Sequence, residues 1–459
     1  MNQEISQNKT ERLGTGPLAK LLVGMCVPSM FGMLVQALYN IVDSIYISRI
    51  EDSEKALSAL SYVFPVQTCI TAFSLCVTMG TSILVSKHLG ERDKEQTNSV
   101  ATNGFCLAII NAIFFMIVGI FFSKLYFSMF TNDTDIIRYG TIYMRIIMVF
   151  SFGVLIEATC SRIIQGTGNM KDPLISQMIG VVTNIVLDPL FIFGIGFFPK
   201  LGVTGAAIAT VIGQILAMLY LTRILFTKTE NVKISIRHNK LNRKTIGEII
   251  QLGLPVFSQE FFTSIAGVLF NGILSMYSAT AIAVYGIGYK LQQLLFLLVA
   301  GMSLGGLPVL SYNFGAKNKD RFLRCLKYLL IASTTLMIIG LLVFNVFLNQ
   351  IVGLFATSTE MGEIAQIAFR SISFSFIFIG ANTIIMVAFQ SVGRYIPSLL
   401  ITSFRVLVLA IPTAWILGKA FGLDAIWLAF AVGEGLCCAI FSPVAYKTFR
   451  SVWHTDNCY

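Results

Sequence analysis

Two otherwise apolar segments of the chain carry acidic and amide side chains at helical spacing. Each set stands on one face of a helix, at i, i+4 and i+7 or at i, i+7 and i+11: Gln36, Asn40 and Asp43, then Gln177, Asn184 and Asp188. A carboxylate on such a helix can bind a proton or a hard cation such as sodium, and a neighbouring amide can orient it. These spacings predict two polar stripes that could take part in ion binding.

Asp43 and Asp188 are the two acids of these stripes, and both lie toward the same end of their segments. A charge left in lipid costs at least about 2.5–3.5 kcal/mol, so both side chains should face the protein interior. Two ionised carboxylates in a dry pocket repel each other. We therefore expect Asp43 and Asp188 to meet, and either to take up a proton or to share a sodium ion.

Proline accompanies both stripes. Pro189 follows Asp188 directly, has no N–H for the carbonyl of Ile185, and disfavours helical geometry at the residue before it. A weakened turn beside a titrating group can couple protonation to bending, and Pro28 offers the first segment the same possibility. The alternative is that both prolines only shape their helices, as many membrane prolines do.

The elements that carry these residues are membrane-spanning helices. The chain has 459 residues, of which 55% are hydrophobic and 12% charged, and its mean hydropathy is +0.77. About 20 apolar residues cross a bilayer as a helix. Twelve segments qualify: 18–48, 56–86, 99–130, 136–165, 173–198, 203–227, 246–275, 280–312, 323–348, 363–391, 396–418 and 424–447.

The twelve segments fall into two halves with one plan. The polar linker 227–245 separates 1–226 from 246–459, and short motifs recur across it, such as "SKHLGERDKE" and "SYNFGAKNKD". Because six is an even number, both halves of the chain enter the membrane from the same side. A pseudo-two-fold axis along the membrane normal should therefore relate them. We predict an all-α polytopic membrane protein made of two six-helix lobes that alternate access to a central cleft.

Further polar residues within spans are candidates for a substrate cavity. Glu260 and Asn271 share a face of span 7, and they join the amides Gln36, Asn40 and Gln177 as predicted cavity residues. An ion pair between Glu260 and Lys290 is an equally good interpretation. For Arg405 we favour snorkelling or structural pairing, and we assign no role to Glu157 or Glu434.

The remaining composition excludes several classes of protein. Nine scattered cysteines and three histidines in polar stretches form neither a disulfide framework nor a metal-binding pattern, so we expect no metal and no cofactor beyond the coupling ion. The net charge of +10 comes from basic loops on one side, which sets topology rather than binding nucleic acid. Both termini should be cytoplasmic.

Three motifs carry a family resemblance. "YNIVDSIYIS", "NIVLDP" and "LGVTGAAIAT", within two six-span halves, make the chain similar to the multidrug and toxic compound extrusion (MATE) family, in its DinF branch and especially its MepA-like members. The resemblance covers nearly the whole chain. It implies a V-shaped pair of lobes, and an ion site on Asp43, Asn184, Asp188 and Thr210 with Tyr143 nearby.

These observations together predict a secondary-active antiporter, not an enzyme, in the inner or plasma membrane. It would export amphipathic, cationic drugs in exchange for H⁺ or Na⁺, act as a monomer and contact membrane lipid. The main alternative is a flippase for a lipid or lipid-linked saccharide, which would need a strongly cationic cavity. A membrane-embedded transferase would need a clustered acidic metal motif or a catalytic histidine near the interface, and the sequence has neither.

Overall fold

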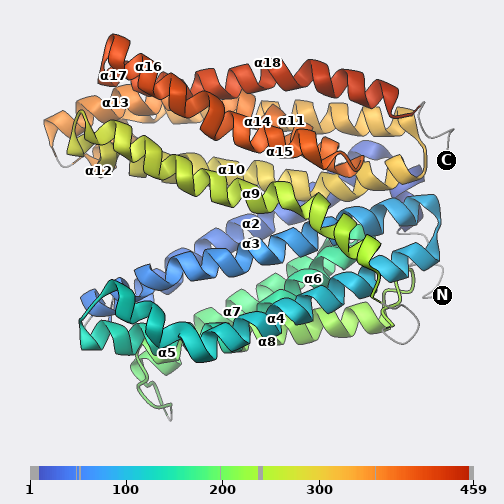
Figure 1. The fold of residues 1–459 in the computed structure, drawn as a ribbon, viewed down its shortest axis with the longest axis horizontal. Coiled ribbons are helices and arrows are strands. Elements are labelled where there is room, and N and C mark those ends of the chain that lie inside the picture. Colours follow the sequence, from blue (N-terminus) through green and yellow to red (C-terminus); the bar gives the residue numbers. More distant parts are fainter. Residues whose placement is uncertain are drawn as a thin grey trace. The chain divides into compact units, whose positions relative to one another are not determined.

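The computed structural model describes residues 10–47, 49–50, 53–196, 198–235, 241–356 and 358–453, and it places no strand among them (Figure 1). The helices of the first half are α2 (Leu18–Ile47), α3 (Ser53–Glu91), α4 (Lys94–Phe130), α5 (Thr134–Val149), α6 (Phe152–Gly166), α7 (Lys171–Phe193) and α8 (Val203–Thr227). Those of the second half are α9 (Arg243–Ser275), α10 (Ala279–Gly315), α11 (Lys319–Val346), α12 (Leu348–Phe355), α13 (Thr359–Ser373), α14 (Phe376–Ser391), α15 (Tyr395–Ser403), the π-helix η1 (Phe404–Ala410), α16 (Ile411–Phe421), α17 (Leu423–Ile426) and α18 (Leu428–Ser451).

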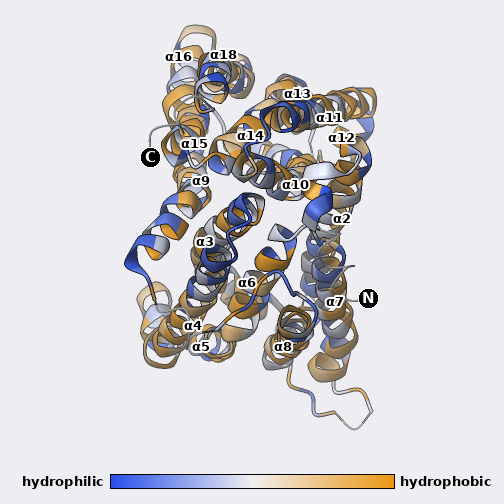
Figure 2. Cartoon of the chain, turned by 90° about the vertical axis from the view of Figure 1, so that its right-hand side faces the viewer, coloured by the Kyte–Doolittle hydropathy of each residue, from blue (hydrophilic) through white to orange (hydrophobic). Residues whose placement is uncertain are grey.

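Most of these helices have the length and composition of membrane spans. Ten of the described helices, or helix runs, are long and apolar enough to cross a bilayer, and two bent pairs bring the number to twelve. Large apolar side chains remain exposed on them, such as Phe121 (71%) and Met129 (74%) of α4, and Figure 2 shows the hydrophobic colouring along that helix. Since apolar surface of this extent belongs in lipid, the predicted all-α polytopic fold with twelve spans is confirmed.

The fourth span of each half is broken rather than continuous. The pairs α5–α6 and α13–α14 are each bent by 41°. Each break falls within a Phe-Ser-Phe triplet, at residues 150–152 and 374–376, and contains no proline. The predicted single helices 136–165 and 363–391 therefore each consist of two helices.

A matching turn precedes the third span of each half. Arg92 (φ 61°) and Lys317 (φ 53°) adopt left-handed conformations, which non-glycine residues rarely do. The next residues, Asp93 and Asn318, cap α4 and α11 by accepting hydrogen bonds from the backbone N–H three residues on. Two such rare turns at equivalent points support the internal repeat.

The chain divides into two compact units. Unit 1 comprises Met1–Gly16 and Phe31–Gly253, and unit 2 comprises Pro17–Met30 and Leu254–Tyr459. The predicted boundaries 1–226 and 246–459 differ from this division, because the first part of α2 groups with unit 2 and residues 243–253 of α9 group with unit 1. Both helices continue from one unit into the other, with Pro28 and Pro255 close to the point of change.

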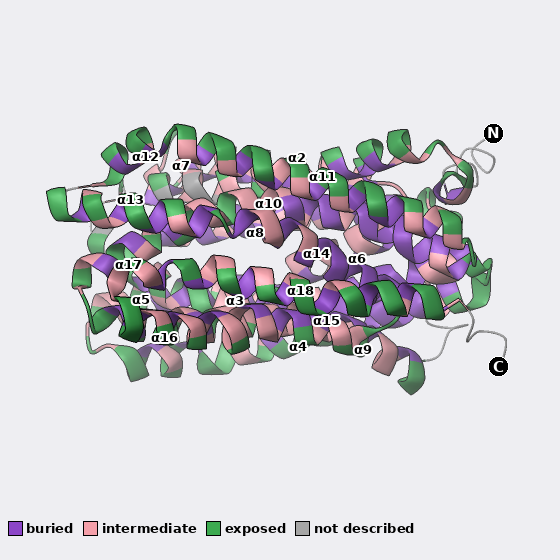
Figure 3. Cartoon of the chain, turned by 90° about the horizontal axis from the view of Figure 1, so that it is seen from above, coloured by how far each residue is buried: buried purple, intermediate pink, exposed green. Residues whose placement is uncertain are grey.

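Small residues allow close helix contact within each unit. In unit 2, a Cβ added to Gly305 of α10 would lie 2.5 Å from the Cα of Cys26, and one added to Gly301 would lie 2.5 Å from the Cα of Met30. Gly301 and Gly305, which are four residues apart on one face of α10, therefore serve helix packing, as is usual for small residues in membranes. The helix α14 is buried along most of its length (Figure 3).

Candidate functional site

The acidic stripe of α7 lies in the interior of unit 1. Asp188 is 0% exposed and Asn184 is 2% exposed, one helical turn away. The amide nitrogen of Asn184 donates to Oδ1 of Asp188 at 3.3 Å and to the hydroxyl of Thr210 on α8 at 3.2 Å. This amide thus holds Asp188 and Thr210 in one hydrogen-bonded cluster.

The close approach of α7 and α8 positions this cluster. A Cβ added to Gly213 would lie 2.6 Å from the carbonyl oxygen of Gly180, so only glycine fits at position 213 without a shift. Gly213 lies three residues after Thr210 on α8, and Gly180 lies four residues before Asn184 on α7. The glycine contact therefore brings Thr210 within reach of Asn184.

Helix α2 brings the second carboxylate to the cluster. Asp43 is close enough to Asp188 for their charges to repel each other, and both charges also act on the hydroxyl of Tyr143. Tyr143, from α5, is 3% exposed. The structure therefore brings Asp43, Asn184, Asp188, Thr210 and Tyr143 together in unit 1.

Three oxygen atoms of the cluster are buried and have no hydrogen-bond partner among the described residues: Oδ1 of Asp43, Oδ1 of Asn184 and Oδ2 of Asp188. A buried acceptor without a donor costs about 1–3 kcal/mol. The cluster is therefore rich in acceptors and poor in donors. Such a site favours a proton, which would turn one carboxylate into a donor, or a small cation with oxygen ligands.

Two residues of this cluster were missed from the sequence. The hydroxyl of Tyr39, on α2, lies 3.4 Å from that of Thr210, and the side chain of Gln67 of α3 lies beside the hydroxyl of Tyr143. Tyr39 stands four residues before Asp43, on the same helix face, so its spacing could have identified it. Gln67 carries no such signal, because its span has no polar stripe ending in an acid.

The predicted amides Gln36 and Gln177 of unit 1 bond to each other. The amide nitrogen of Gln177 donates to the carbonyl of Gly32 at 2.9 Å and to Oε1 of Gln36 at 3.3 Å, which ties α7 to α2. The side chain of Asn40 lies outside the described residues. Pro28 and Pro189 both lie inside continuous helices, so their predicted bending stays a prediction.

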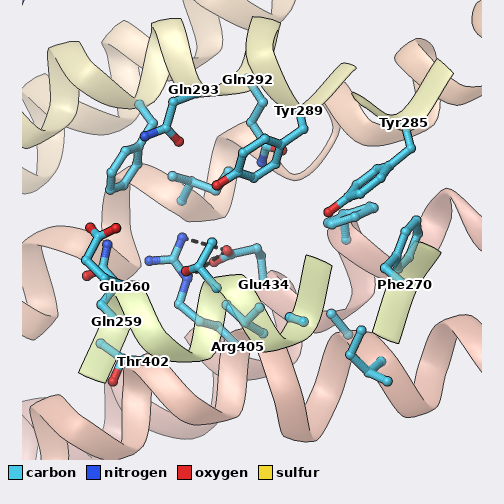
Figure 4. Close-up of a pocket in the computed structure, with 18 residues that line it drawn as sticks. Gln259, Glu260, Phe270, Tyr285, Tyr289, Gln292, Gln293, Thr402, Arg405 and Glu434 are labelled. Atoms are coloured by element: carbon cyan, nitrogen blue, oxygen red, sulfur yellow. Dashed lines mark hydrogen bonds and ion pairs between the residues drawn. The ribbon is translucent and has the colours of Figure 1, made fainter. Parts of the chain in front are cut away.

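Unit 2 contains a cavity of about 130 Å³ among α9, α10, α14, α15, η1, α16 and α18 (Figure 4). Glu260 lines it, whereas Asn271, farther along the same helix, is not among the 18 residues that do. No ion pair between Glu260 and Lys290 occurs among the residues described. Lys290 is exposed. Of the two interpretations of Glu260, the structure therefore favours a cavity residue over an ion pair with Lys290.

The cavity also contains a buried ion pair that the sequence did not predict as a pair. Arg405, on the π-helix η1, contacts Oε1 of Glu434 through Nε at 2.8 Å and through a terminal nitrogen at 2.7 Å. The amide of Asn382 donates to the other oxygen of Glu434 at 2.7 Å. Of the two interpretations of Arg405, snorkelling or structural pairing, the structure therefore fits pairing, and Glu434 is the partner.

Twelve membrane spans, a buried and a partly buried acid in one unit and a cavity in the other are the features of a polytopic membrane transporter. Residues 28–190 and 255–416 match the MatE family, which covers more than half of the chain and repeats once in each half. The chain belongs to this family, and the resemblance found in the sequence is confirmed.

Individual relatives support the same assignment. The chain is 24% identical over 430 residues to the multidrug export protein MepA of Staphylococcus aureus, with 94% of each chain covered, and 24% identical to MepA of Staphylococcus haemolyticus, with 93% covered. Among solved structures, an outward-facing multidrug resistance MATE transporter of the MOP superfamily matches with a TM-score of 0.88 at 25% identity, covering 97% of this chain and 98% of that one. A MATE crystal structure in the bent conformation matches with a TM-score of 0.89 at 24% identity, over 97% and 98%.

Proposed function

We propose that this protein is a secondary-active antiporter that exports amphipathic organic cations, including drugs, in exchange for H⁺ or Na⁺. The observation that carries the proposal is the group of three buried, unpartnered acceptor oxygens on Asp43, Asn184 and Asp188. The name of the Staphylococcus aureus relative, a multidrug export protein, supports the class of substrate.

In this mechanism the counter-ion and the exported cation compete for the same carboxylates. A proton on Asp188 or Asp43 removes the repulsion between them, and a sodium ion would take the free oxygens of Asp43, Asn184 and Asp188 as ligands. Thr210 and Asn184 keep Asp188 oriented in either state. Competition of this kind permits export only when an ion replaces the cargo.

The available ion gradients are sufficient for the work. Each pH unit supplies about 1.4 kcal/mol per proton, and each 100 mV supplies about 2.3 kcal/mol per charge. Pro189 beside Asp188, and Pro28 in α2, are the positions at which ion binding would change helix geometry.

The setting of the transporter follows from the same reasoning. It would lie in the plasma membrane with both termini cytoplasmic, work as a monomer surrounded by lipid, and require no cofactor other than the coupling ion. Nucleic acid would not be a partner, because the excess of basic residues is concentrated in the loops that face the cytoplasm.

The flippase alternative has weaker support. A pyrophosphate-linked lipid would require a strongly cationic cavity, whereas the unit 1 cluster holds two carboxylates and the single arginine lining the unit 2 cavity is paired with Glu434. Together with the drug-export names of the relatives, these charges favour a cationic cargo.

Efflux from proteoliposomes tests the proposal. A fluorescent cationic dye should leave the vesicles when a pH gradient or a sodium gradient is imposed separately, and the effective gradient identifies the ion. Asp188→Asn and Asp43→Asn should each slow gradient-driven efflux at least about tenfold, because a neutral amide cannot exchange the ion. Asp320→Asn, an exposed acid outside the cluster, is the matched control and should be unaffected. Unchanged efflux in both cluster variants would refute the assignment.

A further inference from the structure

A fully buried glutamine in unit 2 has no protein partner for its side chain. Gln390 of α14 is 0% exposed, and neither its amide nitrogen nor its amide oxygen bonds to any described residue. Buried side-chain amides are nearly always hydrogen-bonded, because burial removes water from both ends of the amide. Gln390 does not line the unit 2 cavity, so a ligand in that cavity would not account for it.

The first half of the chain shows how protein groups can satisfy the same amide. The motif "QGTG" at residues 165–168 recurs as "QSVG" at residues 390–393, which aligns the two glutamines. The amide oxygen of Gln165 accepts a hydrogen bond from Arg162 at 3.1 Å, and its nitrogen donates to the hydroxyl of Ser161 at 3.3 Å. Both ends of this amide therefore have partners from the same helix.

In unit 2, apolar side chains stand in place of both partners. Three residues before Gln390, Val387 stands in place of Arg162. Four residues before it, Met386 stands in place of Ser161. Valine has no polar side-chain atom, and a methionine sulfur is at most a weak acceptor. The repeat therefore keeps the glutamine but not the groups that bond to it.

Two further buried hydroxyls lie at the same end of unit 2. Ser311 of α10 and Ser398 of α15 are each 0% exposed and have no partner among the described residues. Both helices pack on α14, and all three polar residues lie close to where α10 and α14 end and α15 begins. In the first half, the hydroxyl of Ser86, which aligns with Ser311, donates to the carbonyl of Gly166, one residue after the aligned glutamine. The repeat therefore favours Ser311 as a neighbour of Gln390.

The chemistry of these groups defines what can satisfy them. The amide nitrogen of Gln390 only donates and its oxygen only accepts, so its partner has to do both. A metal cation cannot accept a hydrogen bond, and a simple anion such as chloride cannot donate one. A water molecule does both, needs little space, and typically makes about three hydrogen bonds to buried polar groups. The hydroxyls of Ser311 and Ser398 can complete such a set.

We propose that this end of unit 2 is an internal water site, in which bound water bridges the amide of Gln390 to the hydroxyls of Ser311 and Ser398. There the water takes the role that Arg162 and Ser161 have in the first half. The site is separate from the acidic cluster of unit 1 and from the unit 2 cavity. The inference therefore goes beyond the proposed function and does not depend on the exchange of any ion.

X-ray hydroxyl-radical footprinting of the purified full-length protein tests this site. An X-ray pulse splits water wherever it is, so bound water releases radicals inside the protein. Met386, one helical turn before Gln390 on the same face, is the reporter. Met337 of α11, 1% exposed in the apolar core of the same unit, is the internal control. Met386 should be oxidised about tenfold faster than Met337, because only Met386 has bound water as a neighbour.

Two further arms separate bound water from access by solvent. Radicals made chemically in the bulk solution reach only exposed side chains, so Met386, at 5% exposure, should then react as slowly as Met337. Gln390→Leu removes the amide at nearly constant volume and should lower the X-ray rate of Met386 about three- to tenfold. Gln366→Leu, which alters an exposed glutamine of α13, is the matched control and should leave that rate unchanged.

The comparison of Met386 with Met337 uses the unaltered protein, so it tests the site even if a variant does not fold. Equal X-ray rates at these two methionines would overturn the proposal. An equally fast reaction of Met386 with bulk radicals, or an unchanged X-ray rate in folded Gln390→Leu, would also overturn it.

Discussion

The acids inside the two units differ in whether their oxygens have hydrogen-bond partners. In unit 1, Asp43 and Asp188 lie near each other with free acceptor oxygens and no cation among the described residues around them. In unit 2, Glu434 is bonded to Arg405 and Asn382 through both oxygens. A satisfied pair stabilises one arrangement, whereas an unsatisfied pair can change its charge. This contrast is why we assign ion coupling to unit 1.

The structural role of the Arg405–Glu434 pair can be tested on its own. Arg405→Leu should lower the free energy of unfolding by about 3–5 kcal/mol, because it leaves the charge of Glu434 buried and unpaired. The double variant with Glu434→Leu should recover most of that loss. Unfolding in mixed micelles measures both values, and Arg370→Leu, an exposed arginine of α13, is the control. A double variant no more stable than Arg405→Leu would contradict a paired structural role.

Residue-level prediction from the sequence succeeded where spacing along one helix carried the signal. The i, i+4 spacing of Asn184 and Asp188 placed them on one face, and the structure joins them by a hydrogen bond. Gln67 reaches the cluster from a different helix, and Glu434 and Arg405 are 29 residues apart. Such contacts depend on helix packing, which periodicity along one segment does not encode.

At the scale of elements, the positions of the helices were predictable and the positions of their bends were not. Apolar length located the spans, because the bilayer sets a minimum helix length. Proline was the expected cause of bending, yet the 41° breaks lie at Ser151 and Ser375 within Phe-Ser-Phe triplets. At the second break, the hydroxyl of Ser375 donates to the carbonyl of Ile372 at 2.7 Å, a local bond that competes with the regular helix pattern.

Close packing of α10 on the first part of α2 gives a prediction at this scale. Gly305→Ala should lower the free energy of unfolding by about 1–3 kcal/mol, because the new Cβ would press on the backbone of Cys26. Gly272→Ala is the matched control, since nothing lies within 4 Å of its added Cβ, and alanine there should be neutral or stabilise by up to about 1 kcal/mol. Equal stability of the two variants, measured by unfolding in micelles, would show that this contact is not tight.

At the scale of the molecule, the repeat in the sequence predicted two halves of six spans, and contacts divide the described chain into two units. Their boundaries differ from the sequence halves because α2 and α9 each contribute to both units. The polar linker 227–245 marks where the repeat restarts, but it does not show where a helix changes its packing partners. Each unit then carries a different polar site, which the repeat alone would not predict. The repeat in the sequence aligns Asp43 with Phe270 or Asn271, and Asp188 with Ile411, so neither acid of unit 1 has an acidic counterpart in the second half.

The most direct test of the central claim is the entry of ions into vesicles during drug efflux. Proteoliposomes loaded with a cationic drug and placed in drug-free buffer should acidify inside or take up radioactive sodium as the drug leaves, because in the proposed exchange an ion replaces each exported cation at the unit 1 carboxylates. The Asp43→Asn/Asp188→Asn double variant should show no such entry above protein-free vesicles. Drug efflux from the unaltered protein without entry of either ion, or undiminished ion entry in the double variant, would contradict the account.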